Sequence, residues 1–196
     1  LMINKYWDNL TDYFNGASFN GLAMVDTSGS MTGIEASAPI NVATSLGIYC
    51  AEKAKGPFAG HYISFSSRPQ LIAVEGVDFV DKCYRIIKTD LCENTNIERA
   101  FDMLLNTAIQ HKMSQADLPE NIIVISDMEF DRCITTGPAS LDRYGSYNSP
   151  RISSESHMET LLEGIARKWA AKGFELPRVV FWNLNARQDN IPAMGG

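Results

Sequence analysis

The sequence predicts an α/β fold with a doubly wound, mostly parallel sheet that carries one antiparallel edge strand, similar to a Rossmann arrangement. Three short apolar runs are typical of buried strands, and helical patterns separate them. One further pair of strand-like segments is joined by turn residues. Strands that alternate with helices form parallel sheets covered on both faces, whereas a tight turn joins antiparallel strands.

The predicted parallel strands are three apolar runs, at residues 22–25, 122–125 and 179–182. Each is bounded by polar residues, and none alternates apolar with polar side chains. A strand that is buried on both faces has this continuous apolar character. We therefore expect three parallel strands inside the protein.

Helices are predicted where apolar residues recur on one face. The first pattern contains Ile40, Ala43, Leu46, Cys50 and Ala54, and later ones cover residues 79–89, 101–108 and 155–171. Lys172 and Gly173 suit the end of the last helix, because glycine is common just past a helix C-terminus.

A hairpin is predicted near the middle of the chain. Residues 66–70 read Ser-Ser-Arg-Pro-Gln, which is turn chemistry, and they separate the strand-like segments 61–65 and 71–74. This pair supplies the antiparallel edge strand.

Composition favours one globular domain over residues 1–196 and disfavours two classes of partner. The net charge is -6, and no run of Lys or Arg could track phosphates, so direct high-affinity binding to nucleic acid is not expected. No apolar run approaches the roughly 20 residues that cross a bilayer, so no membrane association is expected. The chain runs from Leu1 to Gly196, and we expect it to be part of a longer protein.

Four cysteines point to a reducing compartment, which we take to be the cytoplasm. Cys50, Cys83, Cys92 and Cys133 show no C-x-x-C spacing. The first two lie in helical apolar patterns, where a thiol acts as a small hydrophobic group.

The segment 132–154 is expected to be a long, mobile, solvent-exposed loop. It is rich in Ser, Gly, Tyr, Thr and Pro and has no apolar period. It follows a predicted parallel strand, so it leaves the sheet at a carboxyl end, where open α/β sheets bind ligands. Its basic and aromatic side chains leave open a role in stacking bases; they are Arg132, Arg143, Arg151, Tyr144 and Tyr147.

Hard oxygen donors gather at the carboxyl ends of two predicted strands. Residues 22–25 run into Asp26-Thr27-Ser28-Gly29-Ser30, and residues 122–125 run into Ser126-Asp127. Mg²⁺ prefers such ligands. Gly29 is expected to let the turn fold closely around an ion. Alone, D-x-S-x-S also suits an ordinary capping turn, and Thr95, just before a helix, is either an N-cap or a ligand.

This ordered set resembles the metal-ion-dependent adhesion site (MIDAS) of von Willebrand factor type A (vWA) domains. The resemblance implies that Asp26, Ser28, Ser30, Thr95 and Asp127 bind one divalent cation, Mg²⁺ or else Mn²⁺ or Ca²⁺. In that family one coordination position is left to water or to an acidic side chain of a partner. The implied function is cation-dependent binding of a protein that presents Asp or Glu.

The likeness extends to segments outside the metal motif. Residues 55–58, 65–69, 94–96, 126–131 and 181–184 resemble an uncharacterised family in which a vWA half follows a helical half. That arrangement is similar to the Ro ribonucleoprotein autoantigens. The alternative function is therefore a Ro-like ribonucleoprotein component that assists RNA binding by a missing helical domain.

The sequence also departs from the vWA pattern. A vWA domain normally continues with one more strand and a closing helix, and little sequence remains after residue 182 to build them. An unprotected sheet edge is therefore expected, which leaves the oligomeric state open. Met128 follows Asp127 where many vWA domains have glycine.

Catalysis is not expected. Ser28 lacks the G-x-S-x-G context of a hydrolase, and no phosphate-binding glycine loop is present in the sequence. His61, His111 and His157 lack partners at zinc-ligand spacing. Glu129 and Asp131 suit either a solvated loop or support of the cation site.

Overall fold

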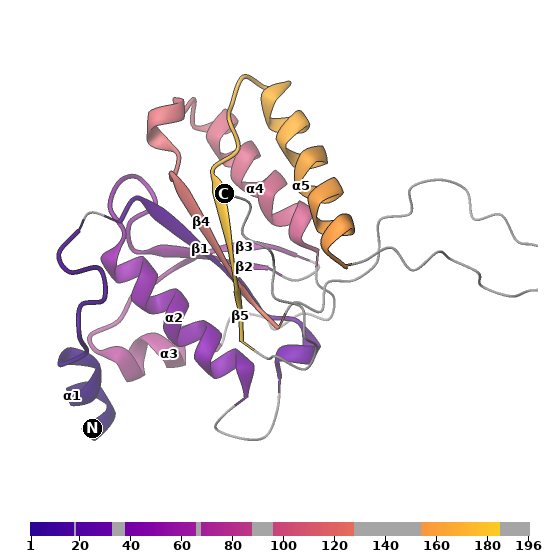
Figure 1. Cartoon of the computed structure of the whole chain (residues 1–196). Coiled ribbons are helices and arrows are strands. Elements are labelled where there is room, and N and C mark those ends of the chain that lie inside the picture. The colour runs from indigo at the N-terminus through magenta and orange to yellow at the C-terminus, as the bar shows by residue number, and fades with distance from the viewer. Residues whose placement is uncertain (18, 33–37, 66–67, 88–95, 128–153, 185–196) are drawn as a thin grey trace, which may run out of the picture.

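The computed structural model describes residues 1–17, 19–32, 38–65, 68–87, 96–127 and 154–184, with the backbone alone for residues 154–159. Its elements are shown in Figure 1. In chain order they are α1 (Met2–Asp8), β1 (Gly21–Asp26), the 3-10 turn η1 (Gly29–Met31), α2 (Pro39–Lys53), β2 (His61–Phe65), β3 (Gln70–Ala73), α3 (Phe79–Ile87), α4 (Ile97–Gln110), the 3-10 turn η2 (Gln115–Asp117), β4 (Asn121–Ser126), α5 (Ser154–Ala170) and β5 (Arg178–Asn183).

The described strands form one five-stranded sheet in the order β3-β2-β1-β4-β5. β1 runs parallel to β2 and β4, and β4 runs parallel to β5. β3 pairs antiparallel with β2, with His61 opposite Ala73. The predicted fold class, the parallel direction of the three strands and the hairpin are thereby confirmed. The prediction that all three strands are buried is wrong for β5, which lies at an edge of the sheet and is only partly buried. Among the described residues none pairs with the outer edge of β5.

The sheet lies between two helical layers, so β1 is buried on both faces. Leu22 and Met24 pack in a core with α4 and α5, while Ala23 and Val25 pack in a second core with α2 and α3. Gly47 allows α2 to approach closely, because a Cβ there would lie 2.6 Å from Val25 Cγ2. This two-sided burial explains why the run does not alternate.

The predicted helices are present with shifts of a few residues at their ends. α5 ends at Ala170, and Gly173 lies in the turn just past it, as expected for a glycine there. Gly173 has a φ of +82° and donates its N–H to the carbonyl of Ala170 at 3.0 Å. Cys50 is buried in α2, and burial raises the pKa of its thiol to about 12. It therefore acts as a small hydrophobic group, as predicted.

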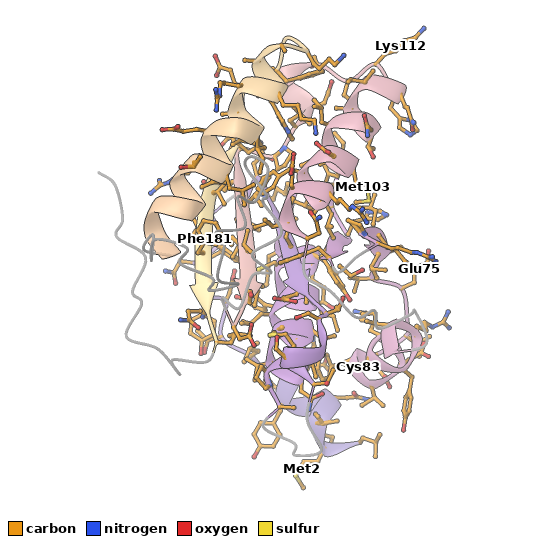
Figure 2. All side chains as sticks on the ribbon, turned by 90° about the vertical axis from the view of Figure 1, so that its right-hand side faces the viewer. Met2, Glu75, Cys83, Met103, Lys112 and Phe181 are labelled. Carbon is orange, nitrogen blue, oxygen red and sulfur yellow. The ribbon has the colours of Figure 1, made fainter. Side chains whose placement is uncertain are left out.

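Sequence patterns assigned no element to residues 1–20, yet α1 forms there. Trp7 stacks on Phe79 of α3 with ring centroids 3.9 Å apart, and Phe14 stacks on Phe19 at 4.5 Å. These aromatic contacts attach the N-terminal segment to the α2 and α3 layer. Figure 2 shows Met2 of α1 and Lys112, beyond the end of α4, at opposite ends of the molecule. In the part of the chain described, no helix is both long and apolar enough to span a bilayer.

Candidate metal site

Asp26 and Asp127 come to the same edge of the sheet because β1 and β4 are parallel neighbours. Their register pairs Leu22 with Ile122 and Val25 with Ile125. Asp26 is the last residue of β1, and Asp127 directly follows β4. Both carboxylates are buried, at 0% and 7% exposure.

This edge is also the switch point of the fold. From β1 the chain passes through α2 to β2 on one side, and it later returns through α4 to β4 on the other side of β1. Connections that leave a strand in opposite directions open a crevice at the carboxyl ends, where open α/β sheets bind ligands. In Figure 1 the arrows of β4 and β5 end on the same side of the sheet.

The turn after β1 gathers the first three candidate ligands. The backbone N–H of Ser28 donates to Asp26 Oδ1 at 2.9 Å, and the hydroxyls of Ser28 and Ser30 lie 3.1 Å apart. Met31, at 0% exposure, packs in the core beside α2 and anchors the end of the turn there. Asp26 and Ser28 are therefore buried while Ser30 is exposed.

Gly29 is not required by the conformation of this turn. Its φ is not positive, and a Cβ placed there would meet nothing within 4 Å. The chain itself would accept a side chain at this position, and close folding of the turn around an ion stays a prediction. The turn is held by Met31 and by the hydrogen bonds of Asp26 instead.

Hydrogen bonds join the turn to both neighbouring strands. The N–H of Thr27 donates to the carbonyl of Phe65 at the end of β2, at 3.1 Å. On the other side, Ser126 Oγ of β4 donates to Asp26 Oδ2 at 2.6 Å. Ser126 was predicted to stand beside Asp127 at the end of a strand, but without a role of its own. The available signal was a hydroxyl residue that ends an aliphatic run.

Burial raises the pKa of Asp26 above its usual value. Hydrogen bonds from Ser126 and Ser28 lower the pKa in part, and the nearby negative charge of Asp127 raises it further. An ionised Asp26 therefore costs the folded state free energy at neutral pH. Either a proton or a bound cation would relieve this cost.

Thr95 lies outside the described residues, but its neighbour decides the capping question. Asn96 is the N-cap of α4, and its side chain accepts a hydrogen bond from the N–H of Arg99 at 3.0 Å. The N-cap alternative for Thr95 is therefore taken by Asn96. Because α4 leads into β4, it begins near the edge at which β1 and β4 end.

Because Asn96 is the N-cap and Thr95 is a predicted ligand, substitutions at these two neighbouring residues are expected to have different effects. Asn96→Ala is expected to cost about 0.5 to 2 kcal/mol of stability through the lost cap while leaving the ligands unchanged. Thr95→Ala is expected to weaken Mg²⁺ binding, and with it partner binding, with little loss of stability. Urea denaturation and calorimetric Mg²⁺ titration of both variants check this. The reverse pattern, a destabilised Thr95→Ala with unchanged affinity, would contradict the ligand role.

The other residues weighed from the sequence add no ligand in the described part. His61 Nδ1 contacts the carbonyl of Ala59 at 2.8 Å, and His111 caps the end of α4. Within the described ranges no group of three or more His, Cys, Asp or Glu could hold an ion. The side chain of His157, together with Glu129, Asp131 and residues 132–153 of the expected loop, lies outside the described residues. Ser154 begins α5, so the expected loop ends one residue earlier.

Fold and site together define a doubly wound α/β domain with a buried cluster of carboxylates and hydroxyls at its switch point. The chain belongs to the family described as "Domain of unknown function (DUF7788)", which matches residues 20–195. It is also similar to "Uncharacterized protein L728" of Acanthamoeba polyphaga mimivirus, with 28% identity over 98% of this chain. The chain spans 30% of the length of that protein.

No solved structure matches the chain significantly. The family and the viral relative carry no description of a ligand or an activity. The resemblance to vWA domains, and the relationship to Ro-like proteins, therefore stay predictions.

Proposed function

We propose that this domain is a non-enzymatic, divalent-cation-dependent protein-binding module. In this proposal Asp26, Ser28, Ser30, Thr95 and Asp127 hold one Mg²⁺-type ion, which accepts an acidic side chain from a partner. The observation that carries the proposal is the meeting of Asp26, Ser28 and Asp127, all nearly inaccessible to solvent, at the switch-point edge.

The chemistry of the donors supports a hard cation. Carboxylate and hydroxyl oxygens suit Mg²⁺, which keeps several waters and needs few protein ligands. A zinc site would instead draw on Cys or His. Two buried carboxylates beside each other repel, so an ion between them would remove an unfavourable interaction. Burial, and to a lesser extent the negative charge of Asp127, also raise the pKa of Asp26.

The burial gradient across the turn supports an open coordination position. Asp26 and Ser28 are buried, whereas Gly29 and Ser30 are exposed. An ion held by Asp26 from the protein side would therefore face solvent on the side of Ser30. A carboxylate from a partner could replace a water there, and the neighbouring segments would set specificity.

A binding role also fits the surroundings of Ser28 better than hydrolysis does. The Ser28 hydroxyl lies 3.1 Å from the Ser30 hydroxyl. A serine nucleophile is usually activated by a histidine base. The two histidines whose side chains are described, His61 at the start of β2 and His111 after α4, lie at the opposite edge of the sheet. The pair of hydroxyls is instead suited to donate two oxygen ligands to the same ion.

Titration of the metal-free protein tests the proposal. Calorimetry with Mg²⁺ is expected to show one ion per chain. Mn²⁺ should compete for that site, and the water-proton relaxation of bound Mn²⁺ should reveal at least one exchangeable water. Absence of Mg²⁺ and Mn²⁺ binding, or a bound Mn²⁺ without exchangeable water, would contradict it. Binding of single-stranded RNA that persists in EDTA would favour the Ro-like alternative.

A further inference from the structure

The register of β1 and β4 places a hydroxyl directly opposite the carboxylate of Asp26. Each paired residue of β4 is numbered 100 above its partner in β1, from Gly21 with Asn121 to Val25 with Ile125. One further step along this register brings Ser126 opposite Asp26. The Ser126 hydroxyl donates to Asp26 Oδ2 at 2.6 Å, and both residues are 0% exposed.

Hydrogen bonds on both oxygens hold the Asp26 carboxylate in one orientation. Oδ1 accepts from the N–H of Ser28 and Oδ2 accepts from Ser126. The Ser28 side chain is also hydrogen-bonded to this carboxylate. An ionised carboxylate offers about four lone-pair sites, so at least one remains for another partner. Rotation of the carboxylate would break two charge-assisted hydrogen bonds, which are among the stronger ones in proteins.

Ser126 is itself held on its far side by the next strand. It pairs with Asn183 of β5, and its carbonyl accepts the N–H of Leu184 at 3.0 Å. The hydroxyl is therefore presented by a strand with neighbours on both edges. This makes it a rigid donor, which a loop residue or a water molecule would not be.

We propose that Ser126 is a positioning residue for the cation site. Its hydroxyl holds Asp26 so that the remaining lone pairs of the carboxylate face the ion, and it does not itself bind the ion. This inference rests on the proposed function, because it assigns the orientation of a ligand of that site. Partners that hydrogen-bond a metal ligand commonly contribute 10- to 100-fold, by order of magnitude, to metal affinity.

Three variants test this role by calorimetric Mg²⁺ titration, with urea denaturation to establish that each is folded. Ser126→Ala is expected to lower Mg²⁺ affinity by about 10- to 100-fold. Ser126→Thr retains the hydroxyl and is expected to restore affinity close to wild type. Ser126→Cys keeps the volume with a weaker donor and is expected to fall between them, which keeps the test usable if Ser126→Ala does not fold.

The matched control is Ser114→Ala. Ser114 Oγ donates to the Asp117 carboxylate at 2.7 Å, the same pair of chemical groups, but before the start of β4 and so at the opposite edge of the sheet. Its Mg²⁺ affinity is expected to equal that of wild type. Unchanged affinity in Ser126→Ala beside a wild type that binds Mg²⁺, or an equal loss in Ser114→Ala, would overturn the positioning role alone. A wild type that binds no Mg²⁺ would overturn the proposed function as well.

Discussion

Asp26→Ala is expected to abolish Mg²⁺ binding while the domain remains folded. The substitution removes a buried carboxylate that is held by Ser28 and Ser126 at the centre of the candidate site. Without the Asp26 carboxylate, the site loses a charged ligand, and the hydrogen bond between Asp26 and Ser126 of β4 is lost as well. Calorimetry should detect no Mg²⁺ binding, whereas Asp26→Asn, which keeps the volume, should show the same loss through charge alone.

The metal-free Asp26→Asn variant is expected to lose no folding stability, although it loses Mg²⁺ binding. Because burial raises the pKa of Asp26, the ionised carboxylate destabilises the folded state at neutral pH, and the neutral amide does not. Asp26→Asn should therefore be at least as stable as wild type in EDTA. Asp117→Asn, at the opposite edge, serves as the control and should bind Mg²⁺ normally. Unchanged Mg²⁺ affinity in Asp26→Asn would contradict the assignment of this residue as a ligand.

Trp169→Ala is expected to cost about 3 to 5 kcal/mol of stability, the range for deleting a large aromatic side chain from a core. Trp169 is at 0% exposure in the core that α4 and α5 form with the sheet. Its Nε1 is buried and meets no hydrogen-bond partner among the described residues. Trp169→Phe should therefore cost much less, because it keeps most of the ring and removes an unpaired donor.

Urea denaturation gives the measurement, and Trp182 supplies the comparison. Trp182 lies on the edge strand β5 and is 48% exposed, so Trp182→Ala should be clearly milder than Trp169→Ala. Similar losses in the two alanine variants would contradict the described packing of α5. Mg²⁺ affinity should be retained in Trp169→Ala under conditions where it is folded, because Trp169 lies near the C-terminal end of α5, away from the site.

Most elements of the fold were predictable because their signals are local. The apolar runs that became β1, β4 and β5 lack alternation, and the turn after residue 65 separates two strand-like segments. α1 was not predicted, although Ile3, Trp7 and Phe14 stand at helical spacing in the sequence. The stacking partners Phe79 and Phe19, which hold this segment in place, are supplied by the folded structure.

The amino-acid sequence by itself determined which oxygen donors end which strands: Asp26, Ser28 and Ser30 after the first and Asp127 after the fourth. The residue types and their spacing are enough for that, since a buried aliphatic run must be followed by the polar residues that end it. The tertiary structure alone decided that β1 and β4 are neighbours and that their register sets Ser126 against Asp26. A register depends on contacts between segments about 100 residues apart, and a slip of one residue would turn every side chain of the strand to the opposite face. No local pattern in either strand carries that information, so the hydroxyl that holds the carboxylate became visible only in the folded chain.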